Sequence, residues 1–318
     1  MSNTVLIIGP NYFNFLTATE NAFKRLGWNT AVESYDNPIH PYTSVMKLRW
    51  KMSRHKDILQ QKSRKEYNTY ILEPQTLDRF RESSKVALWL FDSRQKLPLS
   101  VGHVDHVDAM FCYEEEDVKQ YREEGKQAWF LPQACDTDTY KPLNIERDID
   151  ILFIGNLYFS PKRQQVAKAV VDSFPDRKIR IYGLYKPWYK GLLKWLLREH
   201  RTIYTNHNVT PQKANVLYNR AKVVLNIHQE QQKNGANPRV FEICGTGSYQ
   251  LCDGNPYIDN LFRNGEIGIW HSVDELISMI GKSLESDLHD RAQRAYQEVI
   301  RNHTYDVRMK TVIDTLFN

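Results

Sequence analysis

The segment from Ala221 to Asp253 combines groups that can bind a nucleotide diphosphate, namely the start of a helix, an arginine and a carboxylate. The run from Lys222 to Ile227 is mainly apolar and rich in β-branched residues, which predicts a strand buried on both faces of a parallel sheet. After a polar loop, Asn237 and Pro238 are typical of an N-cap and a first helical residue. The unpaired N–H groups of this helix start would form an anion site at the mouth of the sheet.

The predicted helix carries Arg239 and Glu242 three residues apart, so both lie on one face, which we expect to be exposed. The opposite face is apolar and faces the core, through Val240, Ile243 and Cys244. Exposed ion pairs on helices are common and weak. A pair that is merely solvated therefore stays open as the alternative to a ligand site.

A second phosphate-binding element is predicted where Gly155 and Asn156 close the strand that starts at Asp150. Ser160 and Pro161 follow as a helix start, which brings Lys162 and Arg163 into its first turn. The helix terminus and one of these two basic side chains can share the phosphates of a donor.

Gly9 and Asn11 close the first strand of the chain in a similar way and are included among the donor-binding candidates. A glycine there lets backbone approach a ligand, although strand-to-helix turns also use glycine for steric reasons alone. The Gly-x-x-x-x-Gly-Lys motif of the P-loop does not occur, which argues against an ATPase or a kinase.

Asp92 and His228 are the candidates for catalysis. Asp92 ends the apolar run that begins at Val86, so it is predicted at the carboxyl end of a strand, where it suits a general base that deprotonates an acceptor hydroxyl and gives inversion. A loop-capping aspartate is the alternative. His228 directly follows the strand ending at Ile227, so it either touches the donor or acceptor or is a structural histidine.

No metal site and no cofactor are predicted. His103, Asp105, His106 and Asp108 are close in sequence, but in an extended chain the first two face away from the last two, so the four cannot converge. The four cysteines form no C-x-x-C pair, and we interpret them as small core residues.

The positions of these residues require an α/β fold with two domains, since 318 residues exceed the usual size of one core. Strand-like segments alternate with helical stretches such as Phe15 to Leu26 and Glu115 to Glu124, which predicts doubly wound parallel sheets. We expect domains at 1–143 and 144–300, with a C-terminal helix at 301–318 packing back on the first. The predicted strands lie near residues 4–9, 29–33, 69–72, 86–91, 108–112, 127–131, 150–154, 178–182, 203–204, 223–227 and 249–252.

A cytoplasmic protein is expected, because no apolar run approaches about 18 residues and the N-terminus has no basic leader. The net charge of +5 favours anionic partners. Two segments, 44–66 and 185–201, combine basic with apolar and aromatic residues. Each can lie peripherally on the inner face of a membrane, or can use its apolar stripe for packing alone.

Several of these motifs occur in an order that resembles the spore-maturation CgeB type of glycosyltransferase, which is related to glycosyltransferase families 1 and 4. The resemblance rests on Ile151 to Val170, Ala221 to Asp253 and Glu298 to Leu316, with Ser-Pro-Lys-Arg, Leu-Asn-Ile-His, Arg-x-Phe-Glu and His-Thr-Tyr in order. The first half matches more loosely, through Val86 to Ser93 and Phe130 to Tyr140.

The resemblance implies a GT-B fold, in which two facing Rossmann-like domains enclose a cleft, and a nucleotide-sugar donor, with UDP favoured. It assigns Glu242 to the ribose hydroxyls and Arg239 and Lys162 to the diphosphate. Relatives with a Glu-x7-Glu pair carry a further glutamate where this chain has Asn234, which puts their retaining mechanism in doubt.

The predicted function is metal-independent, hexosyltransferase-like transfer of a sugar to a hydroxyl acceptor, which we expect to be a glycan or a lipid-linked glycan of polysaccharide biosynthesis. A nucleic-acid acceptor such as a modified DNA base stays open, because a basic cleft also suits DNA. A catalytically silent protein that binds sugar nucleotides or polyanions is the alternative of another class.

Overall fold

The computed structural model describes residues 3–9, 13–34, 74–95, 98–157, 160–184 and 203–318. The chain divides into two compact units, unit 1 with Met1–Leu131 and Tyr305–Asn318, and unit 2 with Pro132–Thr304. The contacts thus divide the chain at 131 and 304, whereas the sequence analysis drew domain boundaries at 143 and 300.

Unit 2 is built on a six-stranded parallel sheet with the strand order β11-β10-β9-β6-β7-β8. Counted within the unit, this is the order 3-2-1-4-5-6 of a Rossmann sheet. The order reverses between β6 and β9, which pair in register with Ile151 opposite Val223 and Phe153 opposite Leu225. The strands are β6 (Ile149–Ile154), β7 (Ile179–Tyr182), β8 (Tyr204–Thr205), β9 (Ala221–Asn226), β10 (Gln250–Asp253) and β11 (Gly268–Trp270).

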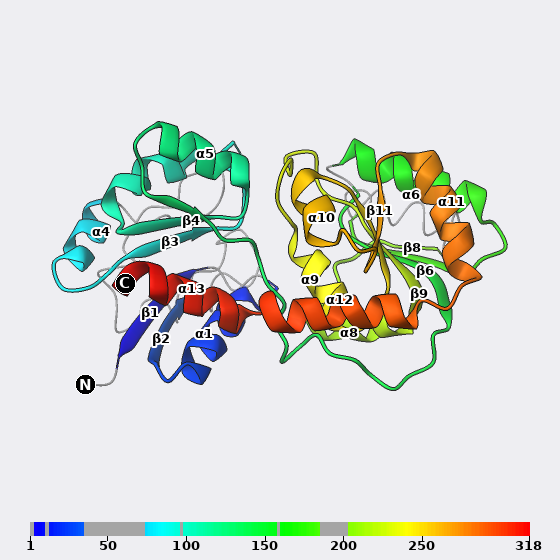
Figure 1. Cartoon of the computed structure of the whole chain (residues 1–318), viewed down its shortest axis with the longest axis horizontal. Coiled ribbons are helices and arrows are strands. Elements are labelled where there is room, and N and C mark those ends of the chain that lie inside the picture. Colours follow the sequence, from blue (N-terminus) through cyan, green and yellow to red (C-terminus); the bar gives the residue numbers. More distant parts are fainter. Residues whose placement is uncertain (1–2, 10–12, 35–73, 96–97, 158–159, 185–202) are drawn as a thin grey trace. The chain divides into compact units, whose positions relative to one another are not determined.

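Helices cover both faces of this sheet (Figure 1). On β6, Ile151 and Phe153 pack with one layer while Leu152 and Ile154 pack with the other, which is why the strand is apolar throughout. The first layer contains α6 (Pro161–Ser173) and α11 (Val273–Leu284). The second contains α8 (Pro211–Arg220), α9 (Pro238–Gly245), α10 (Pro256–Leu261) and α12 (His289–Asn302).

Unit 1 contains two smaller parallel sheets within the described residues. One pairs β1 (Thr4–Gly9) with β2 (Asn29–Ser34), and the other has β3 (Ala87–Leu90), β4 (Ala109–Cys112) and β5 (Ala128–Phe130). Its helices are α1 (Phe15–Arg25), α4 (Pro74–Arg81), α5 (Glu115–Glu123), the 3₁₀ helix η1 (Pro98–His106) and α13 (Tyr305–Phe317).

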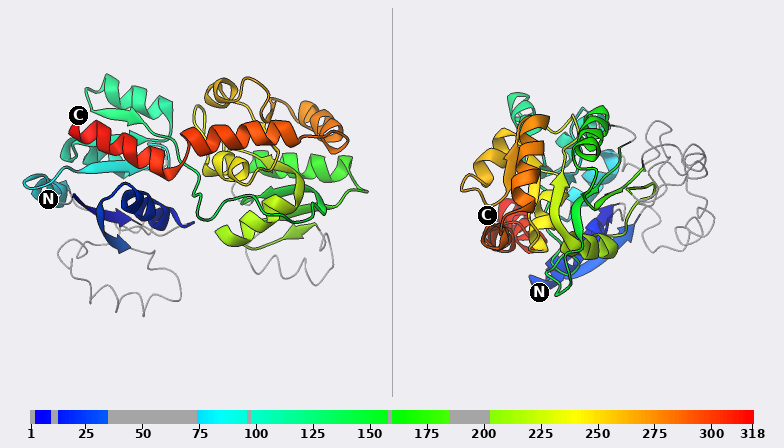
Figure 2. Two further views of the ribbon diagram at one scale, coloured as in Figure 1. Left: turned by 60° about the horizontal axis from the view of Figure 1, so that its bottom comes forward. Right: turned by 90° about the vertical axis from the view of Figure 1, so that its right-hand side faces the viewer.

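The C-terminal helix α13 packs against α1, and the left view of Figure 2 shows these red and dark blue helices next to each other. Arg25 Nη2 lies 2.6 Å from Asp306 Oδ1, and the rings of Trp28 and Phe317 have centroids 5.9 Å apart. The last segment of the sequence therefore completes the unit that contains the first segment.

Most strands and helix starts predicted from the sequence are confirmed within one or two residues. The segment around His103 is an exception, because it forms the 3₁₀ helix η1 and not an extended chain. There Asp105 pairs with Lys126, His106 with Asp78, and Asp108 with Arg81, at 2.6, 2.8 and 3.5 Å.

The strand predicted near 69–72 and the basic segments 44–66 and 185–201 lie outside the described residues. Among the helices that the structure describes, none is both long and apolar enough to cross a membrane.

Candidate functional site

The candidate site of unit 2 lies where its strand order reverses, at the carboxyl ends of β6 and β9. Ligands of such sheets bind outside the carboxyl ends of the strands at this switch point. Gly155 and Asn156 directly follow β6, Ile227 and His228 follow β9, and Asp253 ends the neighbouring strand β10. The starts of α6 and α9, which follow β6 and β9 along the chain, belong to the same end of the sheet.

Helix α6 starts as the sequence predicts, with Ser160 as N-cap and Pro161 at its first position. The Ser160 hydroxyl accepts a hydrogen bond from the backbone N–H of Arg163 at 3.3 Å. A carboxylate completes this helix start, because Glu230 Oε1 accepts from Ser160 Oγ at 2.9 Å and from the backbone N–H of Lys162 at 3.1 Å. Burial acts to raise the pKa of Glu230, but the backbone N–H of Glu230 itself, together with Lys162 and Ser160, lowers it overall. A carboxylate of the protein thus binds where the sequence predicted a phosphate.

The guanidinium of Arg163 is buried, with 3% of the residue exposed, and binds carbonyl groups of the protein. Its Nε and Nη2 donate to the carbonyl of Ile227 at 2.9 and 2.6 Å, and Nη1 donates to that of Asn156 at 3.3 Å. Burial lowers the pKa of Arg163 to about 10. This side chain ties the start of α6 to the ends of β9 and β6, so the expectation that it reaches a donor phosphate gains no support from its geometry.

Gly155 and Asn156 help the ends of β6 and β7 approach each other. A Cβ atom on Gly155 would lie 2.8 Å from Phe153 Cζ, and a Cβ atom on Gly183, where φ is +137°, would lie 2.2 Å from the carbonyl oxygen of Gly155. Asn156 Oδ1 accepts from the backbone N–H of Leu184 at 2.9 Å. Both residues thus have a packing role here, beside the donor contact that the sequence predicts for them.

Gly9 ends β1 in unit 1, and among the described residues an added Cβ there would meet only Leu16, at an ordinary 3.7 Å. Contacts with this part of the chain therefore do not explain the glycine. Asn11 lies outside the described residues.

Asp92 lies in unit 1, two residues beyond the end of β3, and is half-buried. Its charge acts on the neighbouring Tyr113, whose pKa is raised first by burial and then by Asp92. The strand position predicted for Asp92 is confirmed, while its role as a base stays a prediction.

His228, Asp253 and Lys162 form one hydrogen-bonded cluster at the switch point. Asp253 accepts from His228 at two places, the backbone N–H at 2.9 Å and ring Nδ1 at 2.7 Å, and Lys162 Nζ lies 2.5 Å from its other oxygen. Burial acts to raise the pKa of Asp253, but its bonds to His228 and Lys162 lower it to about 2. Sequence analysis missed Asp253, although a carboxylate at the end of a predicted buried strand was a usable signal.

Helix α9 starts at Asn237 and Pro238, as predicted, and a buried network of amides fixes this start. The Asn237 side chain accepts from the backbone N–H of Val240 at 3.3 Å and donates to Asn226 Oδ1 at 2.9 Å. Asn226 donates in turn to Gln250 at 3.3 Å. The cap is a neutral amide, so it does not place a negative charge at the positive end of the α9 dipole.

Glu242 is buried, with 6% of the residue exposed, and the prediction that it lies on an exposed face is wrong. The segment around Cys135 and Tyr140 covers this side of α9, where a Cβ atom on Gly245 would lie 2.3 Å from Cys135 Sγ. Tyr140 and Arg239 both lie close enough to Glu242 to act on its pKa, and Arg239 acts in the same way on Tyr218. Burial raises the pKa of Glu242 to about 7, although Arg239 and Tyr140 oppose that shift.

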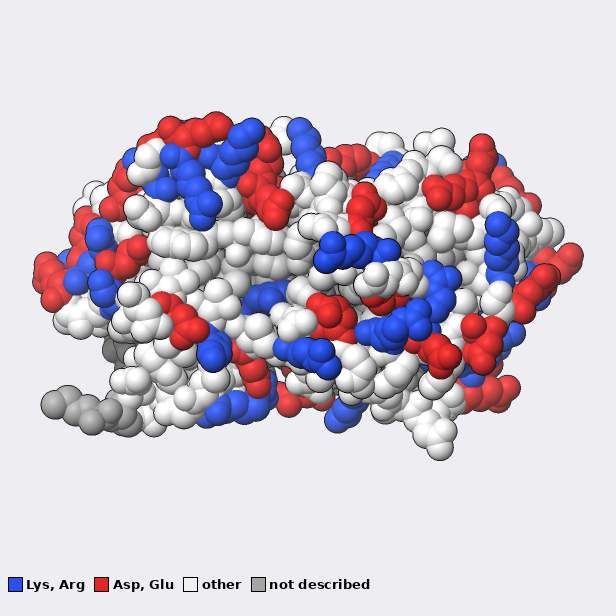
Figure 3. Space-filling view, viewed as in Figure 1, with Lys and Arg blue, Asp and Glu red and all other residues white. Residues whose placement is uncertain are grey.

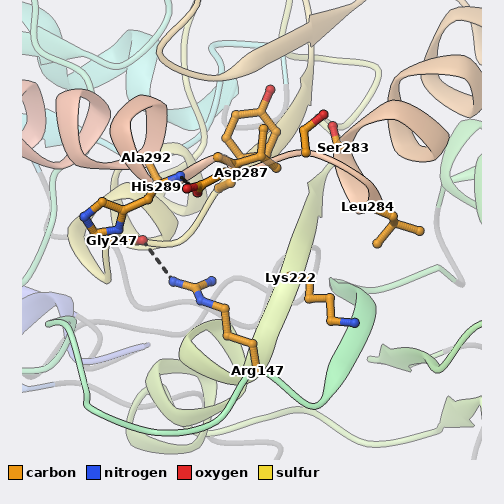
Figure 4. Close-up of a pocket in the computed structure, with 11 residues that line it drawn as sticks. Arg147, Lys222, Gly247, Ser283, Leu284, Asp287, His289 and Ala292 are labelled. Atoms are coloured by element: carbon orange, nitrogen blue, oxygen red, sulfur yellow. Dashed lines mark hydrogen bonds between the residues drawn. The ribbon is translucent and has the colours of Figure 1, made fainter.

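A pocket at the amino end of the same sheet lies apart from this site (Figure 4). Its basic side chains already have partners, since Arg147 donates to the carbonyls of Ala221 and Gly247 at 2.6 and 3.2 Å, and Lys222 pairs with Asp150 at 2.7 Å. We therefore place the candidate site at the carboxyl end of the sheet.

The surface view shows basic and acidic side chains interspersed on one face of each unit (Figure 3). On this face, the described basic side chains do not gather into a broad patch of the kind typical of nucleic-acid-binding proteins.

The fold is of the GT-B class. Residues 162–314 match a family model described as "Glycosyl transferase-like". This span contains α9 with Arg239 and Glu242, and also Lys162, His228 and Asp253.

The chain is similar to the spore protein CgeB of Bacillus subtilis strain 168, with 27% identity over 182 residues. The match covers 53% of this chain and 56% of that protein, so about half of each is compared. The resemblance to the CgeB type drawn from the sequence is confirmed.

Solved structures confirm the fold class. Sucrose-phosphate synthase from Thermosynechococcus elongatus has a TM-score of 0.64 at 11% identity, and 99% of each chain is covered. A glycosyltransferase from Rickettsia africae has a TM-score of 0.61 at 12% identity, covering 100% of this chain and 99% of that one. The Anabaena protein Alr3699/HepE, solved in complex with UDP and glucose, has a TM-score of 0.59 at 12% identity, covering 93% of this chain and 88% of that one.

Proposed function

We propose that this protein transfers a sugar from a nucleotide diphosphate sugar to a hydroxyl acceptor. The observation that carries the proposal is the arrangement at the switch point of unit 2, where α9 presents Arg239 and Glu242 next to the Rossmann-type reversal between β6 and β9. Strand β9 and helix α9, with Arg239 and Glu242, lie within the segment that matches the glycosyl transferase-like model.

In the proposed complex, Glu242 binds the ribose hydroxyls and Arg239 meets the diphosphate. Glu242 is buried, so its bonds to a ligand would form away from water, where charge-assisted hydrogen bonds are strongest. Tyr140 lies near Glu242 and Tyr218 near Arg239, so each hydroxyl can help to position the neighbouring side chain before a ligand binds.

The leaving nucleotide diphosphate would be stabilised by Arg239, Lys162 and the dipole of α9, and we propose that no metal ion is essential. Lys162 is 40% exposed at its side chain, so it can reach a ligand while it remains near Asp253. Asp92 of unit 1 is the proposed base that takes the proton of the acceptor hydroxyl.

The finer assignments are a hexose donor, UDP as its nucleotide, and a glycan or lipid-linked glycan as acceptor. UDP is supported by the structural neighbour that was solved with UDP and glucose. We further propose that the protein acts in the cytoplasm, in polysaccharide biosynthesis, with peripheral membrane contact through residues 185–201.

The proposal is tested by binding and turnover with purified protein. UDP, GDP, ADP and their sugar conjugates are screened by thermal stabilisation, because a ligand of the folded state raises the unfolding temperature. Nucleotide release is then measured with lipid-linked, glycan and DNA acceptors, with and without a chelator of divalent metals.

We expect one nucleotide base to stabilise the protein and turnover to survive the chelator. Arg294→Ala, an exposed arginine of α12, is the matched control for Arg239→Ala. Binding without nucleotide release for any acceptor would support the silent sugar-nucleotide-binding protein, and release with DNA alone would support the nucleic-acid acceptor. No stabilisation by any nucleotide would refute the proposal.

A further inference from the structure

We infer that Asp253 is a positioning residue of the candidate site. It fixes the ring tautomer of His228 so that Nε2 accepts a hydrogen bond from a hydroxyl group of the nucleotide sugar. The inference rests on the proposed function for the identity of the ligand. The orientation of His228 by Asp253 rests on the geometry of unit 2 alone.

Asp253 is nearly enclosed, with 4% of the residue exposed, and its carboxylate binds three donors. Oδ1 lies 2.9 Å from the backbone nitrogen of His228 and 2.7 Å from its ring Nδ1. Oδ2 lies 2.5 Å from Lys162 Nζ. One carboxylate therefore sets the backbone turn after β9, the ring of His228 and the ammonium group of Lys162.

A hydrogen bond from Nδ1 to the carboxylate determines what the other ring nitrogen can do. In the neutral ring the proton stays on Nδ1, so Nε2 keeps a lone pair and acts as an acceptor. Nε2 is buried and has no hydrogen-bond partner among the residues that the structure describes. His228 itself is 1% exposed, and leaving a buried polar atom without a hydrogen bond is unfavourable. A hydroxyl group supplied by a ligand would satisfy it.

A metal ion is the rival explanation, because Cys252 stands beside His228 and Asp253 within the described residues. The 2.7 Å between His228 Nδ1 and Asp253 Oδ1 is a hydrogen-bond distance, whereas two such ligands of a tetrahedral zinc would be separated by about 3.3 Å. Burial also raises the pKa of the Cys252 thiol well above its usual range, which opposes the thiolate that a metal requires. The geometry therefore favours the hydrogen-bonded pair.

A purely structural role is the second alternative explanation. In that role, Asp253 would only stabilise the turn after β9. The decisive readout is the tautomer of His228, which ¹⁵N NMR of the imidazole ring reports directly. The His228 signals are assigned by their loss in His228→Gln. In the parent protein we expect Nδ1 protonated and Nε2 unprotonated at pH 8, with the Nε2 signal shifting when UDP-glucose is added.

Asp253→Asn is the test variant, because it keeps the shape of the side chain and exchanges one carboxylate oxygen for an amide donor. We expect the His228 tautomer to change and affinity for UDP-glucose to fall by about 10-fold or more, as for loss of charge-assisted hydrogen bonds worth about 1.5–3 kcal/mol. Asp150→Asn is the matched control, since it removes the carboxylate of a lysine pair at the other end of the same sheet. It should leave the tautomer and the affinity unchanged.

A double-mutant cycle separates positioning from folding. Once His228 is replaced by alanine, Asp253→Asn should lose the part of its effect that acts through the ring, so the two losses should not add. An unchanged His228 tautomer in Asp253→Asn, or strictly additive losses, would overturn the inference, as would a stoichiometric metal ion that Asp253→Asn abolishes. If Asp253→Asn fails to fold, the tautomer in the parent still decides, because a proton on Nε2 and none on Nδ1 contradicts the assignment. A parent with the expected tautomer that binds no nucleotide would refute the proposed function and leave the orientation by Asp253 intact.

Discussion

Replacing Glu242 by glutamine should stabilise unit 2 above pH 7 while leaving its stability near pH 4.5 almost unchanged. Burial raises the pKa of Glu242 from its ordinary 4.5 to about 7, against the opposing effects of Arg239 and Tyr140. The folded protein therefore binds a proton between these pH values that the unfolded chain has already released. By linkage, the free energy of unfolding of the parent decreases as pH rises through this interval.

The magnitude follows from the two pKa values. Each pKa unit corresponds to about 1.4 kcal/mol, so the interval from 4.5 to about 7 corresponds to roughly 3 kcal/mol. Glutamine is close in shape and cannot titrate, and its side-chain amide is able to hydrogen-bond a neighbouring hydroxyl such as that of Tyr140. The stability difference between Glu242→Gln and the parent should thus grow from about pH 4.5 and level off above pH 7.

Native-state hydrogen exchange of amides in β9 and β10 measures this difference for unit 2 alone, which matters because the chain has two units. Glu285→Gln, at an exposed position after α11, is the control and should show a flat difference. Arg239→Ala should move the decrease in stability to higher pH, since Arg239 opposes the rise in the pKa of Glu242. A difference between Glu242→Gln and the parent that does not vary between pH 5 and 8 would refute the burial argument.

Three further predictions concern function. Arg239→Ala should weaken binding of UDP much more than binding of uridine, and equal losses in calorimetry would remove Arg239 from the phosphate site. Asp92→Asn should cut transfer by about 100-fold or more with donor binding nearly intact, and NMR of the product should show an inverted anomeric centre. Retained configuration or near-parental turnover would exclude Asp92 as the base. Liposome flotation should show binding of the protein to anionic vesicles through residues 185–201 at low salt and its release at high salt, whereas no binding at low salt would leave that segment a packing role.

The sequence predicted the sheet and the helix starts of unit 2 because their signals are local. The apolar run of β9 and the Asn-Pro and Ser-Pro caps of α9 and α6 are read from adjacent residues, and the structure has them where they were expected. The alternation of strands and helices along the chain also predicted the Rossmann-type fold. It did not predict the strand order that locates the switch point.

The environment of the candidate site depends on residues that are distant in sequence. Asp253 and His228 are 25 residues apart, and nothing near either residue in the sequence indicates that they bond. Glu242 is buried by the segment around Tyr140, about a hundred positions earlier in the chain, so helical periodicity alone placed it on the wrong face. Arg163 has a basic side chain at a helix start, but its partners are the carbonyls of Ile227 and Asn156.

The two helix starts at the switch point differ in a way that bears on which of them binds a donor diphosphate. At α6, Glu230 already places a carboxylate on the N–H of Lys162, so a phosphate there would have to displace a negative charge of the protein. At α9, the cap is the neutral amide of Asn237, and Arg239 in the first turn is partly exposed. A diphosphate would add the missing negative charge at α9 while Lys162 reaches it from α6. The sequence predicts both starts as anion sites, and on this difference we propose that α9 holds the phosphates and that α6 supplies a cation.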